Sequence, residues 1–213
     1  LKSRTIPISE NNLFRMMSEV SKEELDFSKI TSVIQNDVAV SLRLLRLVNS
    51  AYYRRMSQID SIRDAVVMLG QERIKMFIMM LFAADIAKGK ADELIKVSIS
   101  RARMAEEAGT LLNMKFTRDE LFTLGLFSNV DAMLGIRMED LVTQLPFSRK
   151  INDALLRKDT AFSNLLFIIK LFERGFLTKA HHFCTRLKVK EERMLDIYLD
   201  SLKMADNFVN TFN

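Results

Sequence analysis

The sequence predicts an all-α protein, and three observations lead to that prediction. No segment of useful length alternates apolar and polar residues with the period of two that marks a half-buried strand. Apolar residues recur instead at helical spacing along nearly the whole chain. Gly and Pro, which interrupt helices, number only six and two among 213 residues. With 48% apolar residues, the chain is also long enough to bury a substantial core.

The first three helices are predicted from their polar start signals. Ser9 precedes a helix that runs through Val20. Ser21 and Glu24 stand at capping-box spacing and predict the start of a second helix. Asp37 can cap a third, whose apolar residues wrap most of its circumference. We therefore expect this third helix to be buried on several sides.

A polar interruption and a glycine divide the next stretch. Asn49 and Ser50 break the apolar run, and Asp60 or Ser61 starts a new helix. Gly70 is expected to end that helix as a left-handed cap. A helix rich in Met and Phe should follow over residues 72–88, and its methionines are interpreted as core filling.

The second half of the chain continues the helical pattern. Thr117 and Glu120 form another capping-box pair, and Pro146 suits the start of a helix. The last predicted helix, from about Glu191, spaces Leu195, Leu199, Leu202 and Val209 on one face. The helices expected here cover residues 91–109, 117–133, 146–156, 160–174 and 191 onward.

Side chains that could hold a metal are sparse. Metal-dependent hydrolysis needs several His and carboxylate ligands at one site. The two histidines, His181 and His182, are adjacent, so on a helix they point about 100° apart. His181 and Cys184 could share a face but supply only two ligands, and Asp131 has neutral neighbours. We predict no metal, no cofactor and no catalytic residue; Cys184 is an inert thiol or, alternatively, a nucleophile activated by His181.

Charge and hydropathy limit the partners and the compartment. The net charge is +5, and residues 41–103 hold twelve Lys and Arg against six Asp and Glu. Such a basic half either attracts nucleic acid or covers solvent-facing helix surfaces, and we favour the second interpretation. The longest apolar run, residues 76–84, is too short to cross a bilayer. A single cysteine suits a reducing compartment, so we predict a cytoplasmic protein without membrane contact.

Two stretches of the first half carry a family resemblance. IQNDVAVSLRLLRLVNSAYY (34–53) and QIDSIRDAVVMLGQERIKMFIMM (58–80) resemble the HDOD family, bacterial signalling domains related to the HD phosphohydrolases. The resemblance implies an HD-superfamily-like helical bundle. The residues that carry it are Asp37, Leu42, Leu44, Leu45, Asn49, Ser50, Ala51, Tyr52, Ser61, Ile62, Ala65, Leu69, Gly70, Ile74 and Lys75.

The second half resembles a subgroup in which the HDOD domain follows an EAL domain, the type that hydrolyses c-di-GMP. The stretches concerned are residues 91–109, 125–135 and 138–156. On this resemblance residues 1–10 are expected to be the end of an interdomain linker, in keeping with a start at Leu1 rather than Met. Residues 11–213 would then form the HDOD domain, with a soft subdivision near 89–91.

The resemblance also implies what became of the hydrolase site. In HD hydrolases the frame GL-x-HD places a His and an Asp on the metal. Here the frame reads GLFSN, with Ser128 and Asn129 at those two positions. The resemblance therefore implies a non-catalytic regulatory or output domain. We expect it to bind a protein partner, either its own EAL domain or a second copy of the chain.

Three further expectations remain open. Asn49, Ser50, Tyr52 and Tyr53 form a candidate interaction element, or simply a capped turn with packed tyrosines. A vestigial pocket near Ser128 and Asn129 could instead sense a nucleotide. The candidate phosphate contacts of such a pocket are Arg101 and Arg103. Nucleic-acid binding by the basic half ranks third, because few aromatic residues accompany its cations.

Overall fold

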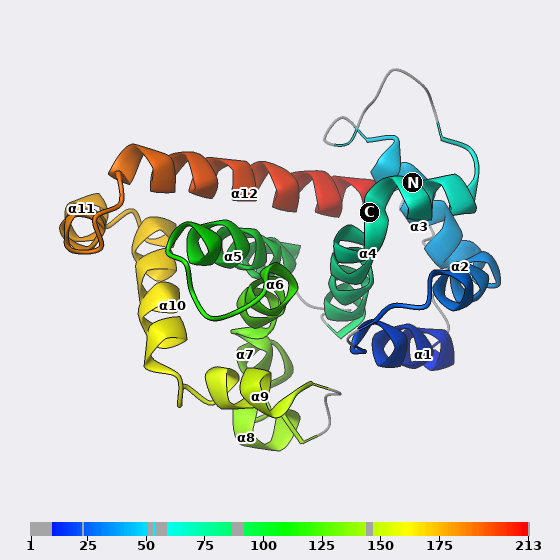
Figure 1. Cartoon of the computed structure of the whole chain (residues 1–213), viewed down its shortest axis with the longest axis horizontal. Coiled ribbons are helices and arrows are strands. Elements are labelled where there is room, and N and C mark those ends of the chain that lie inside the picture. The colour runs from blue at the N-terminus through cyan, green and yellow to red at the C-terminus, as the bar shows by residue number, and fades with distance from the viewer. Residues whose placement is uncertain are drawn as a thin grey trace. The chain divides into compact units, whose positions relative to one another are not determined.

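The computed structural model describes residues 10–22, 24–50, 53, 59–86, 92–143 and 147–212. Throughout these ranges the regular structure is helical and no strand occurs, which confirms the all-α prediction (Figure 1). Residues 1–9, and with them most of the predicted linker, lie outside the described ranges, as do Tyr52, Gly89 and Pro146.

Twelve helices are assigned in the described part of the chain. Their order is α1 (Glu10–Val20), α2 (Phe27–Gln35), α3 (Val38–Val48), α4 (Ile62–Ile86), α5 (Asp92–Leu111), α6 (Arg118–Phe127), α7 (Val130–Leu134), α8 (Met138–Leu141), α9 (Arg149–Leu155), α10 (Thr160–Glu173), α11 (Leu177–Arg186) and α12 (Glu191–Phe212).

These helices divide into two compact units. The first comprises residues 1–85 together with 206–213, and the second comprises residues 86–205. The chain passes from the second unit back to the first within α12. The subdivision predicted near residues 89–91 falls on residues outside the described ranges, so it stays a prediction.

Local caps determine where α2 and α3 begin. The Asp37 carboxylate accepts hydrogen bonds from the backbone N–H groups of Ala39 (3.0 Å) and Val40 (3.1 Å), as its position predicted. The predicted capping box at Ser21 and Glu24 is wrong. Ser21 Oγ donates instead to the Met17 carbonyl at the end of α1, and the N-cap of α2 is Asp26, five residues after Ser21.

Helix α3 is less enclosed than its composition suggested. Ala39, Val40, Leu44, Leu47 and Val48 are buried, but Val38 and Leu42 are exposed. One side of α3 therefore faces solvent, and the expectation of burial around most of the helix is corrected. The apolar pattern could not reveal this, because it does not say how many neighbours a helix has.

Gly70 interrupts α4 at the predicted position. Its φ of 71° and ψ of 177° are non-helical, so α4 consists of two helical stretches joined at a kink. This backbone conformation is almost restricted to glycine, but it is the extended region at positive φ and not the left-handed helical cap that we predicted.

The second unit is organised around close packing of α5 against α6. An added Cβ at Gly125 would lie 2.5 Å from the Arg101 carbonyl oxygen and 2.6 Å from Ala102 Cα, so the two backbones nearly touch there. The predicted capping box at Thr117 and Glu120 is present at the start of α6. Helix α6 ends at Ser128, and the short α7 begins after Asn129, whereas a single helix through Met133 had been expected.

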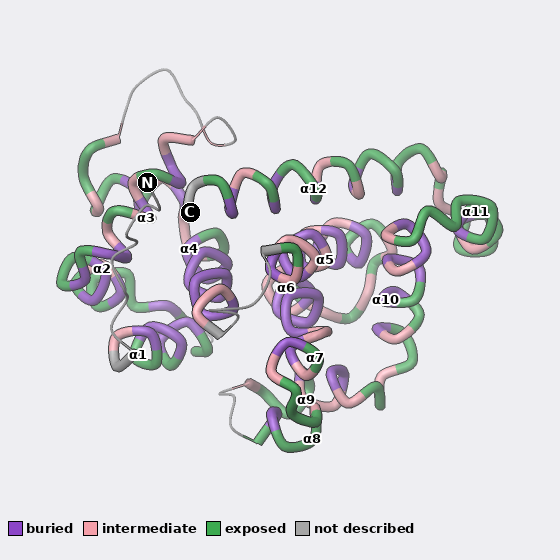
Figure 2. The backbone as a smooth tube through the Cα atoms, turned by 180° about the vertical axis from the view of Figure 1, so that it is seen from behind, coloured by how far each residue is buried: buried purple, intermediate pink, exposed green. Residues whose placement is uncertain are grey.

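Burial follows the helices of each unit. The fully buried large side chains include Phe77 in the first unit and Phe122, Phe127, Phe162 and Phe172 in the second. In Figure 2 buried segments recur along α4, α5, α6 and α10. None of the helices in the described ranges combines the length and the apolar character that a membrane crossing requires.

Candidate functional site

Ser128 and Asn129, the positions predicted to correspond to the HD pair, form the junction between α6 and α7. Ser128 Oγ donates to the Gly125 carbonyl (2.8 Å), and Asn129 Oδ1 accepts a hydrogen bond from the buried Ser98 hydroxyl of α5 (2.8 Å). Both side chains thus hold the junction together. A hydroxyl and an amide supply neither the imidazole nor the carboxylate that a catalytic metal site of His and Asp ligands uses.

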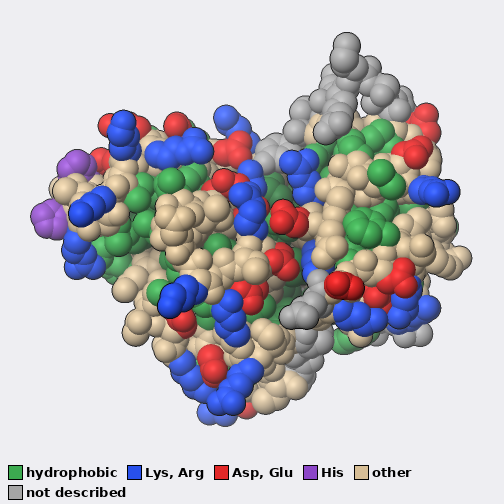
Figure 3. All heavy atoms as spheres, viewed as in Figure 1, with side chains coloured by type: hydrophobic (Ala, Val, Ile, Leu, Met, Phe, Trp, Pro, Cys, Tyr) green, Lys and Arg blue, Asp and Glu red, His purple; other side chains and the backbone are tan. Residues whose placement is uncertain are grey.

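The other candidate ligands are not brought together. His181 lies on the exposed surface of α11, where Nδ1 is 2.6 Å from a Glu191 carboxylate oxygen (Figure 3). Cys184 is buried, and burial raises the pKa of its thiol, with the negative charge of Glu191 as a smaller cause. Among the described residues no three His, Cys, Asp or Glu side chains are grouped as a metal site would need.

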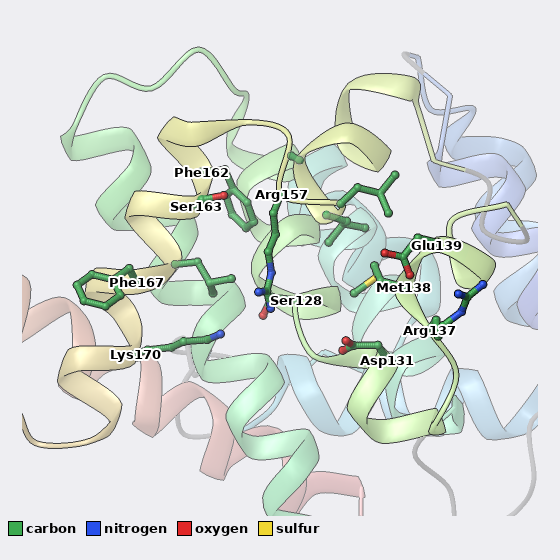
Figure 4. Close-up of a pocket in the computed structure, with 14 residues that line it drawn as sticks. Ser128, Asp131, Arg137, Met138, Glu139, Arg157, Phe162, Ser163, Phe167 and Lys170 are labelled. Carbon is green, nitrogen blue, oxygen red and sulfur yellow. The ribbon is translucent and has the colours of Figure 1, made fainter.

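A pocket of about 510 Å³ opens beside Ser128 in the second unit (Figure 4). This volume lies within the range of about 300–1,000 Å³ that is usual for small-molecule sites. Its lining comes from the α6–α7 junction, α8, the end of α9 and α10. The lining residues are Ser128, Asp131, Arg137, Met138, Glu139, Ala154, Leu155, Leu156, Arg157, Phe162, Ser163, Leu166, Phe167 and Lys170.

One side of this pocket is positively charged. In Figure 4 the Arg157 side chain extends toward Ser128, and the Lys170 amine points toward the same region. Burial lowers the pKa of Lys170, and the nearby positive charges of Arg101 and Arg157 lower it further. Asp131 lies on another wall of the pocket, and Arg137 is paired with Asp140 (3.1 Å).

The predicted phosphate contacts Arg101 and Arg103 are engaged with carboxylates. Arg101 makes a two-pronged ion pair with Glu173, at 2.6 and 2.8 Å, and its third nitrogen lies 3.5 Å from Ser128 Oγ. Arg103 pairs with Glu106 and Glu107, both at 2.8 Å. Neither arginine lines the pocket. Their assignment as phosphate contacts remains a prediction, and the pocket offers Arg157 and Lys170 instead.

Sequence reasoning missed Arg157 and Lys170. They come from the end of α9 and the middle of α10, and only the tertiary packing places them on one pocket. The sequence carries no local signal for them: the φ of 60° at Arg157, just after the last turn of α9 where glycine is the usual residue, is visible only in the structure.

The candidate interaction element at the end of α3 is tied to its own unit. The Asn49 side chain donates to the carbonyls of Leu45 (2.9 Å) and Ile59 (2.7 Å) and accepts from the Ile59 N–H (2.9 Å). Ser50 accepts a hydrogen bond from Asn207 (3.1 Å). The Arg73 guanidinium lies 5.8 Å from the centre of the Tyr53 ring. The Asn49 contacts fix the end of α3 to Ile59, shortly before α4. An interaction role for Asn49, Ser50, Tyr52 and Tyr53 stays a prediction.

Helix α12 has apolar side chains on two opposite faces. Met194, Ile197, Met204 and Ala205 are buried, together with Ser201, whose hydroxyl lies 2.7 Å from that of Ser100. The predicted apolar face points the other way: Leu195, Leu199 and Leu202 are 37%, 47% and 38% exposed, whereas Val209 is buried. Figure 2 shows this alternation of buried and exposed segments along α12. We call Leu195, Leu199 and Leu202 the leucine face.

Part of the basic excess is engaged in contacts within its own unit. Lys75 is buried and donates to the Lys22 carbonyl (3.0 Å), while Arg101 and Arg103 are ion-paired. On the face of the molecule in Figure 3, Lys and Arg side chains are interleaved with Asp and Glu.

Comparison with known proteins agrees with this architecture. The model of the HDOD domain matches residues 6–150. The cyclic di-GMP phosphodiesterase CdgJ of Vibrio cholerae is 30% identical over 88% of the chain, and the uncharacterized protein YuxH of Bacillus subtilis is 29% identical over 92%. The chain spans just under half the length of these relatives, 43% of CdgJ and 48% of YuxH.

Two solved structures are also similar. One is a protein of Shewanella amazonensis described as a candidate metal-dependent phosphohydrolase, with 16% identity and a TM-score of 0.48 over 98% of this chain and 92% of that one. The other is the MmoQ response regulator of Methylococcus capsulatus, with 17% identity and a TM-score of 0.41 over 93% and 99%.

Proposed function

Because the chain belongs to the HDOD family, we propose that it is a non-catalytic regulatory domain of a cytoplasmic bacterial signalling protein. The observation that carries this proposal is the use of Ser128 and Asn129 in the α6–α7 junction. Their side chains bind Gly125 and Ser98 of the same unit, in the frame where an HD hydrolase presents its metal ligands. With the pair used in this way, the helical scaffold is left for recognition.

The second-messenger context comes from the relatives. CdgJ is named as a cyclic di-GMP phosphodiesterase, and more than half of its length lies outside the region matched by this chain. We place this domain in c-di-GMP signalling on that basis. In our proposal any phosphodiesterase activity of the full-length protein belongs to an EAL-type domain, and the HDOD domain modulates it.

The leucine face of α12 is the surface we assign to this contact. Three partly exposed leucines at spacings of four and three residues form an apolar stripe on one side of a helix. Such a stripe is small compared with the interfaces that hold independent proteins together. A tethered partner needs less contact area, because the linker keeps its effective concentration high. This favours a domain of the same polypeptide over a second copy of the chain.

Nucleic-acid binding receives less support. That function requires a basic surface whose cations are available to phosphates. Lys75, Arg101 and Arg103 already hold partners within their own units.

The docking proposal is tested by adding this chain in trans to the separately expressed EAL domain of the full-length protein. We expect binding in calorimetry that is weakened about tenfold or more by Leu199→Glu, since a charge there opposes burial. The matched control is Arg193→Glu, a change at an exposed residue on another side of the same helix. Equal binding by wild type and Leu199→Glu would remove the leucine face from the proposal.

A further inference from the structure

The pocket of the second unit contains two cations, Arg157 and Lys170, that form no ion pair among the described residues, although the charge of Glu173 acts on Lys170 from further away. Arg101 is neutralised by Glu173, but among the described residues no carboxylate lies within ion-pair distance of Arg157 or Lys170. The positive charge of Arg157 is one of the causes that lower the pKa of Lys170, so the two cations are near enough to repel each other. An anion between them would remove this repulsion.

The backbone at Arg157 is unfavourable for any residue that has a Cβ. With its φ of 60°, the position suits glycine, and an L-residue is strained there. The same conformation directs the arginine side chain into the pocket toward Ser128 (Figure 4). Strain combined with a cavity-facing cation is typical of a position kept for binding.

The side chains on the other walls of the pocket indicate the chemistry of the rest of the ligand. Leu155, Phe162 and Leu166 provide apolar surface next to the cations. Asp131 and Glu139 line another part of the pocket, where they would repel an anion. A bound oxyanion is therefore oriented toward Arg157 and Lys170, and its uncharged body lies against the apolar side chains.

We propose that this pocket binds a small molecule in which a phosphate monoester or a carboxylate is attached to an apolar body. The planar guanidinium of Arg157 suits the oxygens of either group, and Lys170 adds a second charge. Ser128 Oγ and Ser163 Oγ already donate to backbone carbonyls, so the two cations are the donors that hold the anion. This ligand role adds to the regulatory function proposed above and does not depend on it.

The probes are phenyl phosphate and benzoate, with benzyl alcohol as the uncharged analogue and inorganic phosphate as the anion without a body. Binding to the whole chain is measured by calorimetry and by thermal unfolding at millimolar concentrations. We expect at least one aromatic anion to bind and raise Tm, and benzyl alcohol to leave Tm unchanged. Comparison of phenyl phosphate with benzoate tells which oxyanion the pocket prefers.

The Arg157→Gly variant distinguishes a loss of ligand affinity from a loss of protein stability. Glycine adopts a positive φ without strain, so we expect an unchanged or higher Tm and an affinity reduced about tenfold or more. Lys188→Gly is the matched control, because Lys188 has a φ of 56° but does not line the pocket. Lys170→Met should likewise weaken binding. The proposal is overturned if neither aromatic anion binds, or if both bind Arg157→Gly as tightly as wild type.

Discussion

Asn49 illustrates how one side chain closes a loop. Its amide makes three hydrogen bonds, two of them to the backbone of Ile59, ten residues further along the chain. Asn is well suited to this task because the same side chain offers both a donor and an acceptor. The residue that stood out in the sequence as a break in an apolar helix is thus a clamp between the end of α3 and the approach to α4.

We predict that Asn49→Ala lowers the free energy of unfolding by about 1–3 kcal/mol, since it leaves half-buried backbone groups of Leu45 and Ile59 without this partner. Urea denaturation measures the effect. Asn164→Ala, on the exposed side of α10, is the control and should change stability by no more than about 0.5 kcal/mol. A similar loss in both variants would contradict the clamp.

Cys184 gives a pH-dependent prediction. Burial raises the pKa of its thiol in the folded protein above the ordinary value of 9.0. The folded state therefore disfavours the thiolate. The stability contributed by the neutral thiol is complete below pH 9.0 and is lost as the pH rises through the higher folded pKa.

We accordingly expect the free energy of unfolding of wild type to fall more steeply above pH 9.0 than that of Cys184→Ala, as measured by urea denaturation. Iodoacetamide should alkylate the native protein far more slowly than the urea-unfolded chain. Equally fast alkylation of both forms would show that Cys184 is an accessible, reactive thiol.

At the scale of helices, the crossing of α5 and α6 fixes the geometry of the α6–α7 junction. Gly125 lets the backbone of α6 approach that of α5, and Ser98 of α5 reaches Asn129 just beyond the end of α6. The same close approach therefore supports the junction formed by Ser128 and Asn129, the predicted HD positions.

Gly125→Ala should destabilise the protein by about 1–3 kcal/mol or more, because its Cβ would meet the backbone of Arg101 and Ala102 and backbone cannot move aside easily. Gly109→Ala is the matched comparison. Its Cβ would meet only the Leu121 side chain, at 2.6 Å, which can rotate, and alanine favours the helix by about 1 kcal/mol. Denaturation curves that rank Gly109→Ala as the more damaging change would refute this packing account.

The helix starts and the helix faces differ in how far the sequence predicts them. Asp37 and Thr117 were identified correctly, because a cap acts on backbone groups two or three residues away. The apolar face of α12 was predicted from residue spacing alone, which does not show which helices pack against it. α12 carries apolar residues on two faces, and only the tertiary neighbours decide which of them is buried. The pocket was missed in detail for the same reason: Arg157 and Lys170 are separated in sequence and meet only through packing.

Substitutions on the two faces of α12 should differ in how much they lower the free energy of unfolding. Ile197→Ala, on the buried face, should cost about 2–5 kcal/mol in urea denaturation. Leu199→Ser, on the leucine face, should change the free energy of unfolding by about 0.5 kcal/mol or less. A large loss at Leu199 would mean that this face is part of the fold and not available to a partner.

At the scale of the whole molecule, the chain has the helical fold of the HDOD family, and we propose that its HD-type site no longer binds a metal. The family match establishes the scaffold. The proposed loss of activity rests on Ser128 and Asn129, whose side chains are part of the junction. In our proposal, the functional surfaces are the leucine face, for a protein partner, and the pocket beside Ser128, for an anion.

The most direct test of the non-catalytic proposal is a hydrolysis assay of this chain with c-di-GMP and linear nucleotides, in the presence of Mg²⁺ or Mn²⁺. We predict product formation no faster than in the protein-free blank for wild type and for Ser128→Ala/Asn129→Ala alike. Turnover that stops on addition of a chelator and is lost in the double variant would contradict the account.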